Sequence, residues 1–589
     1  MSGHDPAPSP NDLPAFLRGI ALFSPLDAAG IAELALALEP RMLPGGAVLF
    51  DEGDVADALY VVRSGGLAAY RREPGATVVL LGMIGVGEVA GEISLIAQTP
   101  RRSLVRALRD SVVLRLSAQA FHRLVGKYPQ AMMHTVGVTA RYLLDRPEQV
   151  RYSAPRTFAI LPHDAGVDAH GFARSLEAML SRYGSCALID ATVARGRDAA
   201  WLHQVEHAHR YVLLLGDAGE SAWREQCARQ ADAFLLPVNA ADAASPWPEV
   251  AWINATHKPL RTRHLVLLHA GDIGLGRATA WLSQLCGARH HHVRGDRAAT
   301  DIERLARLLT GRSLGLVLSG GGARGFAQIG VVRALREDGQ QIDCVGGTSI
   351  GAIIGAGVAL DWSDEEMFSN YRRAFVDGKP LRDYTFPFIS LTRGHRVARL
   401  LRAAFGERDI TDLPLPFYAV TANLTAGVAQ VHRAGSLWFW LRAASAIPGV
   451  LPPVFHRGEV FVDGAVINNL PVDPMRAAQV GDVIGIDIGA DDVLKAKVEE
   501  AFLPALWRTV LDHLRRKPRP GILNILLRAG MVNAEAASAA RRAQTSLLLA
   551  PPMRDIGLLD WHEYERAIAS GYRYARELLG RGAAPRSLP

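Results

Sequence analysis

A serine between glycines, directly after an apolar run, constrains the fold of this chain more than any other feature. The run at 342–345 leads into Gly347-Thr348-Ser349-Ile350-Gly351. This spacing predicts a sharp strand-to-helix turn, because neighbours that carry a Cβ would clash around the bend. The turn would present the Ser349 hydroxyl at the edge of a sheet. Ser349 is therefore the candidate nucleophile, and the residues expected to shape its turn are Gly347, Thr348 and Gly351.

A glycine-rich loop lies upstream, between a predicted strand at 314–318 and a predicted helix. The loop consists of Gly320, Gly321, Gly322, Ala323, Arg324 and Gly325. Its adjacent glycines leave backbone N–H groups uncovered at the positive end of a helix, which suits an oxyanion. The loop also satisfies the GxGxxG pattern of a dinucleotide-binding turn, which stays as an alternative. Against that alternative, the next strand leads into the Ser349 turn and does not end in an acidic residue placed for a ribose.

Asp463 follows the apolar run 460–462 and precedes a glycine, where a carboxylate at the end of a strand is expected. A catalytic triad in the order serine, acid, histidine would need a histidine after Asp463. Only His513 and His562 qualify, and both lie in patterns typical of surface residues. We therefore predict that Asp463 accepts the proton of Ser349 directly. Nucleophile, amide donors and carboxylate together predict a serine hydrolase.

A chain of 589 residues exceeds the size that one hydrophobic core usually serves. Short strands between turn residues, at 48–50, 58–62, 66–70 and 77–81, predict a small β-roll. Farther on, apolar runs alternate with helical stretches, which predicts parallel α/β sheets. The predicted division is a flexible tail at 1–12, the β-roll at 13–150, a Rossmann-like α/β domain at 155–310, a catalytic α/β domain at 314–490 and a helical segment at 491–589 packed on it.

Charge and composition limit the classes of partner. The formal charge of +6 is small for this length, so it is compatible with an anionic membrane surface and does not indicate nucleic acid. The four cysteines are scattered, as expected for reduced thiols. His290-His291-His292 cannot all face one metal from a regular element, so no metal site is expected. The sequence has no signal-peptide pattern and no run of about 18 apolar residues, so we expect a cytoplasmic protein without a spanning helix.

The catalytic motifs carry a family resemblance. Gly-Gly-Gly-Ala-Arg-Gly, Gly-Thr-Ser-Ile-Gly and Asp-Gly-Ala, in this order, resemble the patatin-like phospholipase family. The surrounding stretches 323–331, 345–352 and 466–471 resemble its neuropathy target esterase branch, which is made of lysophospholipases. The third motif ends in alanine, where glycine is commoner, and the family tolerates both.

The resemblance covers about 314–489 and extends weakly through the middle region. It implies a patatin-like α/β hydrolase domain with Ser349 as nucleophile, Asp463 as base and the loop from Gly320 as oxyanion hole. The implied reaction is hydrolysis of phospholipid or lysophospholipid esters through an acyl-enzyme, without a metal or a catalytic cofactor. Arg324 is expected to orient backbone groups.

A second resemblance lies in the β-roll. Residues 91–95 followed by 99–105 resemble the phosphate-binding cassette of cyclic nucleotide-binding domains. In such a cassette Gly91 allows close approach, Glu92 accepts from a ribose hydroxyl and Arg101 holds the cyclic phosphate. Arg102 departs from the small residue usual in the family. The resemblance implies cyclic AMP or cyclic GMP as an allosteric ligand of Gly91, Glu92, Ile93, Ser94, Arg101, Arg102 and Ser103. The alternative is a roll kept only as a scaffold.

A basic amphipathic pattern spans 502–519 and fits either an anionic bilayer or packing on the catalytic domain. Peripheral membrane contact is therefore left open, as is the oligomeric state. Three rival functions also stay open for the whole chain. They are a catalytically idle signalling module, an acyltransferase and a nicotinamide-binding protein that uses Gly320–Gly325.

Overall fold

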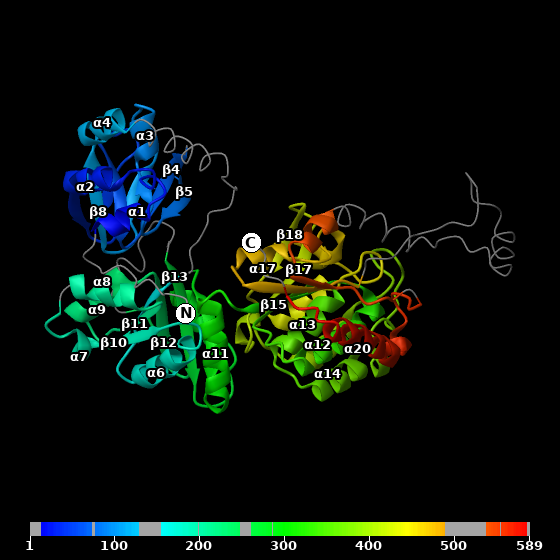
Figure 1. The fold of residues 1–589 in the computed structure, drawn as a ribbon. Helices are drawn as coiled ribbons and strands as arrows, with labels where there is room; N and C mark the ends of the chain where they lie inside the picture. The colour runs from blue at the N-terminus through cyan, green and yellow to red at the C-terminus, as the bar shows by residue number, and fades with distance from the viewer. Residues whose placement is uncertain are drawn as a thin grey trace, which may run out of the picture. The chain divides into compact units, whose positions relative to one another are not determined.

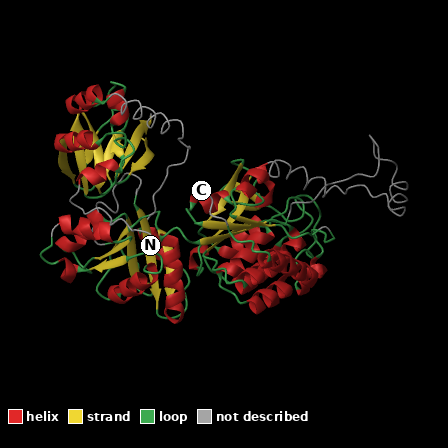
Figure 2. Ribbon diagram, viewed as in Figure 1, coloured by secondary structure: helices red, strands yellow, loops and turns green. Residues whose placement is uncertain are grey.

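A computed structural model describes residues 13–73, 77–128, 155–197, 199–247, 261–285, 287–488, 537–553 and 555–585. The chain forms two compact units (Figures 1 and 2). The first comprises Met1–Asn239, Ser245–Val266 and Leu285–Arg289, and the second comprises Ala240–Ala244, Leu267–Gln284 and His290–Pro589. The predicted tail at 1–12 and the basic amphipathic stretch at 502–519 lie outside the described residues. The limits of the five segments given above stay predictions.

The N-terminal roll consists of two four-stranded sheets, with the orders β1-β8-β3-β6 and β2-β7-β4-β5. Its strands are β1 Leu38–Leu43, β2 Val48–Phe50, β3 Ala58–Ser64, β4 Leu67–Glu73, β5 Thr77–Ile84, β6 Val89–Ala90, β7 Leu104–Ala107 and β8 Ser111–Ser117. Its helices are α1 Leu13–Arg18, α2 Ala28–Ala37, α3 Glu92–Ile96 and α4 Ala118–Lys127. In β3, Leu59 and Val61 join the core beneath these helices, whereas Tyr60 and Val62 join the other core of the roll. This two-residue alternation confirms the predicted β-roll.

The middle region is an α/β domain with the strand order β10-β11-β9-β12-β13-β14. Its strands are β9 Thr157–Ile160, β10 Cys186–Ile189, β11 Tyr211–Leu215, β12 Ala233–Asn239, β13 Thr262–His269 and β14 Arg289–Arg294. Its helices are α6 Ala169–Leu180, α7 Ala191–Ala194, α8 Ala199–Ala208, α9 Ala222–Gln230, α10 Arg277–Gln284 and α11 Ala298–Leu309. Strands β10, β11, β9 and β12 run parallel, and every residue of β9 and β11 is buried. Burial on both faces is typical of a parallel sheet covered by helices, and it confirms the predicted fold class.

The catalytic sheet has the order β19-β20-β17-β16-β15-β21-β22, with β18 beside β17. Its strands are β15 Leu314–Leu318, β16 Cys344–Thr348, β17 Phe417–Asn423, β18 Val428–His432, β19 Val454–His456, β20 Glu459–Asp463, β21 Asp482–Ile486 and β22 Leu547–Leu549. Five neighbouring strands of this sheet, β17, β16, β15, β21 and β22, run parallel, as predicted. Strands β18, β19 and β20 form an antiparallel edge, which the sequence analysis did not foresee.

Helices cover both faces of this sheet (Figure 1). They are α12 Ala327–Glu337, α13 Ile350–Ala359, α14 Asp364–Tyr371, α15 His395–Phe405, α16 Leu437–Ala444, α17 Asp473–Ala477 and α20 Tyr564–Gly580. In β15, Leu316 and Leu318 pack into the core shared with α12, α13 and α20, while Val317 packs with Met475 of α17. The strand that precedes the glycine-rich loop is therefore fixed from two sides.

Helices α12 and α20 lie side by side (Figure 1) and approach closely at two glycines. A Cβ on Gly330 would lie 2.0 Å from the Ile568 carbonyl oxygen, and a Cβ on Gly571 would lie 2.0 Å from that of Ala327. Because Ala327 begins α12 directly after the glycine-rich loop, this contact fixes the start of that helix.

We predict that Gly571→Ala lowers the stability of the catalytic unit by about 1–3 kcal/mol, because the added methyl has no space. Gly580→Ala in the same helix is the matched control, since a Cβ there would meet nothing within 4 Å. It should leave stability unchanged or raise it by up to about 1 kcal/mol. Thermal and urea unfolding of the two variants beside the parent chain measure the difference. Equal effects of both substitutions would contradict the close packing.

Candidate functional site

Ser349 lies in the turn between β16 and α13, as the glycine pattern predicts. Its backbone has φ 56° and ψ −132°, a region that residues with a Cβ rarely adopt. The turn also needs its glycines. A Cβ on Gly351 would lie 2.4 Å from the Leu318 carbonyl oxygen, and one on Gly347 would lie 2.6 Å from the carbonyl carbon of Gly351. Thr348 is buried, and its hydroxyl donates to the Asn468 carbonyl at 3.0 Å.

Asp463, the last residue of β20, meets the Ser349 side chain. The Ser349 Oγ donates a hydrogen bond to Asp463 Oδ2 at 2.6 Å, and Asp463 Oδ1 accepts from the Ala465 N–H at 2.9 Å. Ser349 is 5% exposed and Asp463 is 3% exposed. Residues 114 positions apart in the sequence are thus brought into direct contact inside the catalytic unit.

Burial controls the acidity of this carboxyl group. It raises the pKa of Asp463 from 3.8 to about 6, while the hydrogen bonds from Ser349 and from the Ala465 N–H act in the opposite direction. At neutral pH the group is ionised, yet it is a stronger base than an exposed aspartate. A carboxylate with such a pKa, in hydrogen-bond contact with a hydroxyl, has the geometry of a general base.

The histidines that follow Asp463 do not complete a triad among the described residues. His562 is 75% exposed and lies 3.5 Å from Glu563, whereas His513 lies outside the described residues. His432 is close to the sheet edge, where its Nε2 is 2.7 Å from Thr421 Oγ1 and its ring stacks on Trp440. Burial lowers the pKa of His432 to about 4, so this ring is neutral and serves packing.

The glycine-rich loop lies against the nucleophile. A Cβ on Gly320 would lie 2.9 Å from the Ser349 Cβ. The Gly320 N–H donates to the backbone oxygen of Asn469 at 3.3 Å and to its side-chain oxygen at 3.1 Å. The Ala323 N–H donates to the Leu558 carbonyl at 2.8 Å. Of the consecutive loop amides, those of Gly321 and Gly322 lie between these two occupied donors.

The rest of the loop serves packing. A Cβ on Gly325 would lie 2.4 Å from Ile350 Cγ2, so this glycine lets the loop close onto α13. Arg324 Nε donates to the Ile556 carbonyl, which agrees with the expected backbone-orienting role. Asn469, which holds Gly320, was not among the predicted site residues. Its sequence signal was its place, six positions after Asp463, in the stretch 466–471 that resembles the family.

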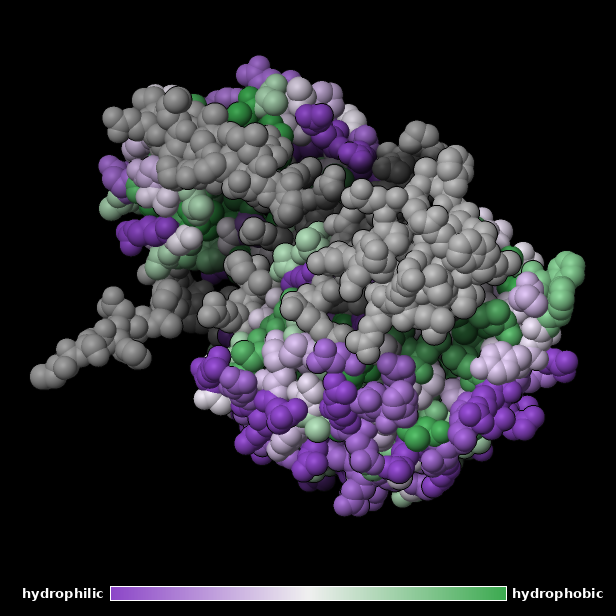
Figure 3. All heavy atoms as spheres, turned by 90° about the vertical axis from the view of Figure 1, so that its right-hand side faces the viewer, coloured by the Kyte–Doolittle hydropathy of each residue, from purple (hydrophilic) through white to green (hydrophobic). Residues whose placement is uncertain are grey.

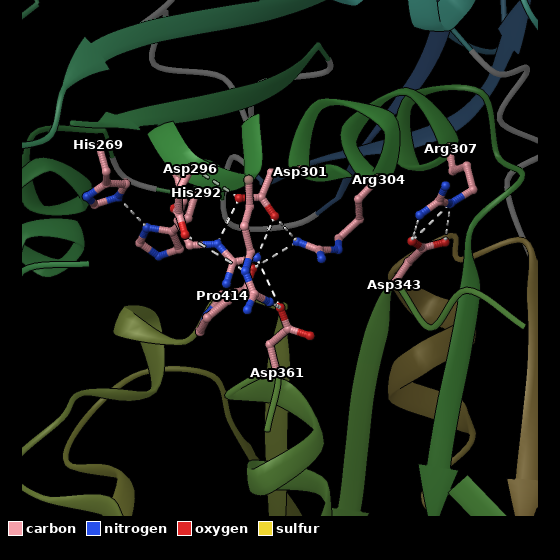
Figure 4. A network of polar contacts seen from close by, with 11 residues as sticks. His269, His292, Asp296, Asp301, Arg304, Arg307, Asp343, Asp361 and Pro414 are labelled. Atoms are coloured by element: carbon pink, nitrogen blue, oxygen red, sulfur yellow. Dashed lines mark hydrogen bonds and ion pairs between the residues drawn. The ribbon is translucent and has the colours of Figure 1, made fainter. Parts of the chain in front are cut away.

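Helix α11 and the residues before it anchor the strand–turn–helix unit that carries Ser349 (Figure 4). Arg307 donates to Asp343, immediately before β16, at 2.7 and 3.1 Å. Asp361, two positions after α13, accepts from Arg294 at 3.2 Å and from Arg297 at 2.6 Å. Ion pairs therefore hold both ends of the unit, from the side opposite the Ser349 turn.

A buried carboxylate organises these arginines. Asp301 of α11 accepts from Arg294 at 2.8 Å through two nitrogens and from Arg304 at 2.9 Å. Burial acts to raise the pKa of Asp301, but the arginine hydrogen bonds and charges outweigh it and keep this pKa below its ordinary value. Next to this cluster, the side chain of His292 links that of His269, at 2.8 Å, to the Thr411 carbonyl, also at 2.8 Å (Figure 4).

The predicted cassette residues lie in α3 and in the segments that connect it to β6 and β7. Gly91 has φ +84° and precedes α3, and its carbonyl accepts from Arg101 Nη1 at 2.9 Å. Arg101 is buried, donates also to the Ala58 carbonyl at 2.6 Å and lies over the Phe50 ring at 4.2 Å. Glu92, Ile93 and Ser103 are half-buried, Ser94 is buried and Arg102 is exposed.

Three family models match this chain. The patatin-like phospholipase model matches residues 316–476, and the cyclic nucleotide-binding domain model matches residues 40–128. A model described as the neuropathy target esterase family P-loop like domain matches residues 154–308. The three matches fall on the three regions described above.

Whole proteins are also similar to this chain over most of its length. An NTE family protein of Mycobacterium tuberculosis is 30% identical over 594 residues, which cover 96% of both chains. The human patatin-like phospholipase domain-containing protein 6 is 28% identical and covers 93% of this chain but 45% of its own length. A lysophospholipase of Aspergillus niger is 29% identical and covers 98% of this chain and 44% of its own. This chain thus spans less than half the length of the human and fungal relatives.

The raised pKa of Asp463 predicts a pH-dependent gain in stability from Asp463→Asn. Between pH about 4 and 6 the folded state retains a proton that the unfolded state has lost, so stability falls as pH rises through this window. Above pH 6 the variant should be more stable than the parent, by up to about 3 kcal/mol. Below pH 4 the gain should vanish. Urea unfolding from pH 4 to 8 measures the free energy of unfolding of the variant and of the parent. Asp338→Asn, at an exposed position, is the control. A gain in stability that does not depend on pH would contradict the raised pKa of Asp463.

Proposed function

Because this chain belongs to the neuropathy target esterase family, we propose that it is a serine hydrolase of phospholipid or lysophospholipid acyl esters. The observation that carries the proposal is the 2.6 Å hydrogen bond from Ser349 to a buried carboxylate, beside a glycine-rich loop that touches the nucleophile. Relatives named as a patatin-like phospholipase and a lysophospholipase support the same class of substrate.

Acylation uses the pair directly. Ser349 Oγ attacks the ester carbonyl while its proton passes to Asp463 Oδ2, and the carbonyl oxygen becomes an oxyanion. We infer that the N–H groups of Gly321 and Gly322 receive this oxyanion, because Gly320 and Ala323 already donate elsewhere. One such donor is commonly worth about 2.7–4 kcal/mol in the transition state. Collapse of the intermediate expels an alkoxide, which takes the proton from Asp463. The released alcohol is a lysophospholipid when the substrate is a phospholipid, and the glycerol backbone with its phosphate headgroup when the substrate is a lysophospholipid.

Deacylation repeats these steps with water. Asp463 removes a proton from a water molecule, whose oxygen attacks the acyl-enzyme carbonyl at the same oxyanion site. The second tetrahedral intermediate then releases the fatty acid, and Ser349 recovers its proton from Asp463. No step calls for a metal or a redox cofactor.

The three rivals make different demands on the same geometry. Acyl transfer would replace the water by an alcohol acceptor, so product analysis with and without added acceptor lipid separates it from hydrolysis. A catalytically idle signalling module has no need for a strained serine in contact with a base of raised pKa. The nicotinamide alternative needs the loop amides for a pyrophosphate, whereas those of Gly320 and Ala323 already donate within the protein.

We predict that Ser349→Ala and Asp463→Asn each lower hydrolysis of lysophosphatidylcholine by at least about a thousandfold. Asp338→Asn, which is exposed, and Ser64→Ala, which is buried in β3 of the roll, should retain the parent rate. Because only ionised Asp463 accepts the proton, kcat/KM should fall about tenfold per unit below pH 6 and level off above it. Fatty acid release measured from pH 4.5 to 8.5 reports both effects. An Asp463→Asn variant within tenfold of the parent would refute the dyad.

We further propose that the N-terminal roll binds a cyclic nucleotide through Arg101. Burial lowers the pKa of this arginine, although the charges of Tyr60 and Asp57 oppose that effect. Its Nε–H is buried without a hydrogen-bond partner among the described residues. A buried guanidinium with an unused donor, beside the left-handed Gly91, is suited to an anion such as a cyclic phosphate.

Ion pairs connect this roll to the middle domain, which supports a regulatory role for nucleotide binding. Arg109, in the turn between β7 and β8, is half-buried and pairs with Glu206 at 2.6 Å and with Asp232 at 3.0 Å. The neighbouring Asp110 pairs with Arg229 at 3.4 Å. Since β7 starts three positions after Arg101, a shift of the cassette would reach these ion pairs through one short strand.

Calorimetric titration of the full chain with cyclic AMP and with cyclic GMP tests the sensor. We expect saturable binding of one of them, with a loss of at least about tenfold in affinity for Arg101→Ala, because a charge-assisted contact is worth about 1.5–3 kcal/mol. Arg41→Ala is the matched control, since this arginine is exposed in β1 of the roll and lies outside the cassette. The scaffold alternative would be correct if neither nucleotide bound.

Membrane contact is proposed as peripheral. No helix in the described part of the chain combines the length and the hydropathy that crossing a bilayer requires. The expected cytoplasmic localisation stays a prediction.

A further inference from the structure

An exposed apolar loop stands out on the catalytic unit. Between α14 and α15 the chain runs Tyr384-Thr-Phe-Pro-Phe-Ile-Ser-Leu391, and four of these side chains are large, apolar and more than half exposed. Phe388 is 91% exposed and Phe386 is 77% exposed. Single exposed apolar residues are ordinary, but a cluster in one short loop marks an interaction surface. In Figure 3, hydrophobic residues (green) reach the surface in separate patches among hydrophilic ones (purple).

The loop is held at its base and free at its tip. Tyr384 pairs with Thr392 in an antiparallel bridge, and the Thr385 N–H donates to the Leu391 carbonyl at 3.0 Å. Thr392 is buried, and its hydroxyl donates to the Val450 carbonyl at 2.8 Å. The rings of Phe386 and Phe388 lie 5.8 Å apart. The loop is therefore an apolar projection whose base is fixed by hydrogen bonds.

Backbone hydrogen bonds connect this projection to the catalytic base. The Leu391 N–H donates to the Gly449 carbonyl at 2.8 Å. Three residues before Gly449, the Ala446 carbonyl accepts from the Asp463 N–H at 3.0 Å. One short segment thus joins the loop to the strand end that carries Asp463.

Two more exposed apolar side chains lie next to β20, the strand that ends at Asp463. Leu424 follows β17, and its N–H donates to the Val460 carbonyl of β20 at 2.9 Å. Phe455 lies in β19 opposite Val460. Both are more than half exposed. Apolar side chains therefore extend from the loop to the sheet edge beside the dyad.

The charges around the loop select the partner. No acidic residue occurs from Tyr384 to Leu391. Arg382 and Arg393, one on each side of the loop, are both exposed, and Arg457 is exposed beside Phe455. Aromatic tips with arginines at their base match a phospholipid surface, where rings enter the interfacial layer and guanidinium groups meet phosphates.

We propose that residues 384–391 insert into the surface of a phospholipid bilayer and hold the catalytic edge against it. The inference deepens the proposed function, since the docked lipid is the substrate class of the dyad. The docking itself requires no hydrolysis, so the two can fail separately.

Vesicle binding of the full chain in the Ser349→Ala background tests the docking without lipid turnover. The probe is vesicles of phosphatidylcholine with phosphatidylserine, separated by flotation. We expect Phe386→Ser with Phe388→Ser to weaken binding by at least about tenfold, because two aromatic side chains leave the lipid. The matched control is Leu36→Ser with Val55→Ser, two apolar side chains 90% and 82% exposed in the roll. This control should bind like the parent, and circular dichroism and thermal melting confirm folding of both.

A second measurement uses chains with Ser349 intact. The ratio of vesicle lysophospholipid hydrolysis to hydrolysis of a soluble short-chain ester should fall by at least about tenfold in the loop variant. Equal vesicle binding of parent and loop variant would overturn the proposal. Loss of self-association with unchanged vesicle binding would overturn it too, since a second copy of the chain would then cover the loop. Vesicle binding that depends on the loop, in a chain that hydrolyses no lipid, would support docking and refute the proposed function.

Discussion

The strained backbone of Ser349 is the constraint on which the catalytic unit depends. A residue with a Cβ combines φ 56° with ψ −132° only where the surrounding structure holds it there. Here the Leu318 carbonyl lies where a side chain at position 351 would be, so the strand and the helix close tightly on either side of the turn. The ion pairs of Asp343, before β16, and of Asp361, after α13, fix the two ends of the strand and helix that lie far from the turn. Strain of this kind directs the hydroxyl outward from the sheet edge, toward the carboxylate of β20.

The second constraint is a buried carboxylate that the described residues leave without a cationic partner. Asp301 is buried too, but two arginines neutralise it and its pKa is low. Asp463 accepts from a hydroxyl and from one backbone N–H of the described residues, so burial dominates and its pKa is high. The first arrangement stabilises a fold, whereas the second keeps a base strong enough to take a proton from serine. Electrostatic surroundings thus distinguish an anchoring aspartate from a candidate catalytic one.

Local patterns in the sequence predicted the parts whose geometry is local. The glycines around Ser349, the glycine-rich loop and the strand before Asp463 act within a few residues, and the structure brings them together. The antiparallel edge, the Asn469 contact with Gly320 and the pairing of Arg307 with Asp343 join distant positions, for which periodicity carries no signal. Arg101 shows the limit most clearly. Its spacing from Gly91 predicts a phosphate contact, which stays a prediction, but no pattern in the sequence indicated that it also donates to the carbonyls of Gly91 and Ala58.

Burial of the dyad also bears on how a lipid reaches it. Transfer of a fatty acyl chain from a bilayer through water to a buried serine would expose each CH₂ at a cost of about 0.8 kcal/mol. An enzyme docked on the bilayer shortens that exposure, because the chain passes from one apolar environment to another. The apolar loop is hydrogen-bonded to the same segment that holds the Asp463 backbone. Docking through this loop would therefore bring the membrane to the one sheet edge where the nucleophile and its base meet.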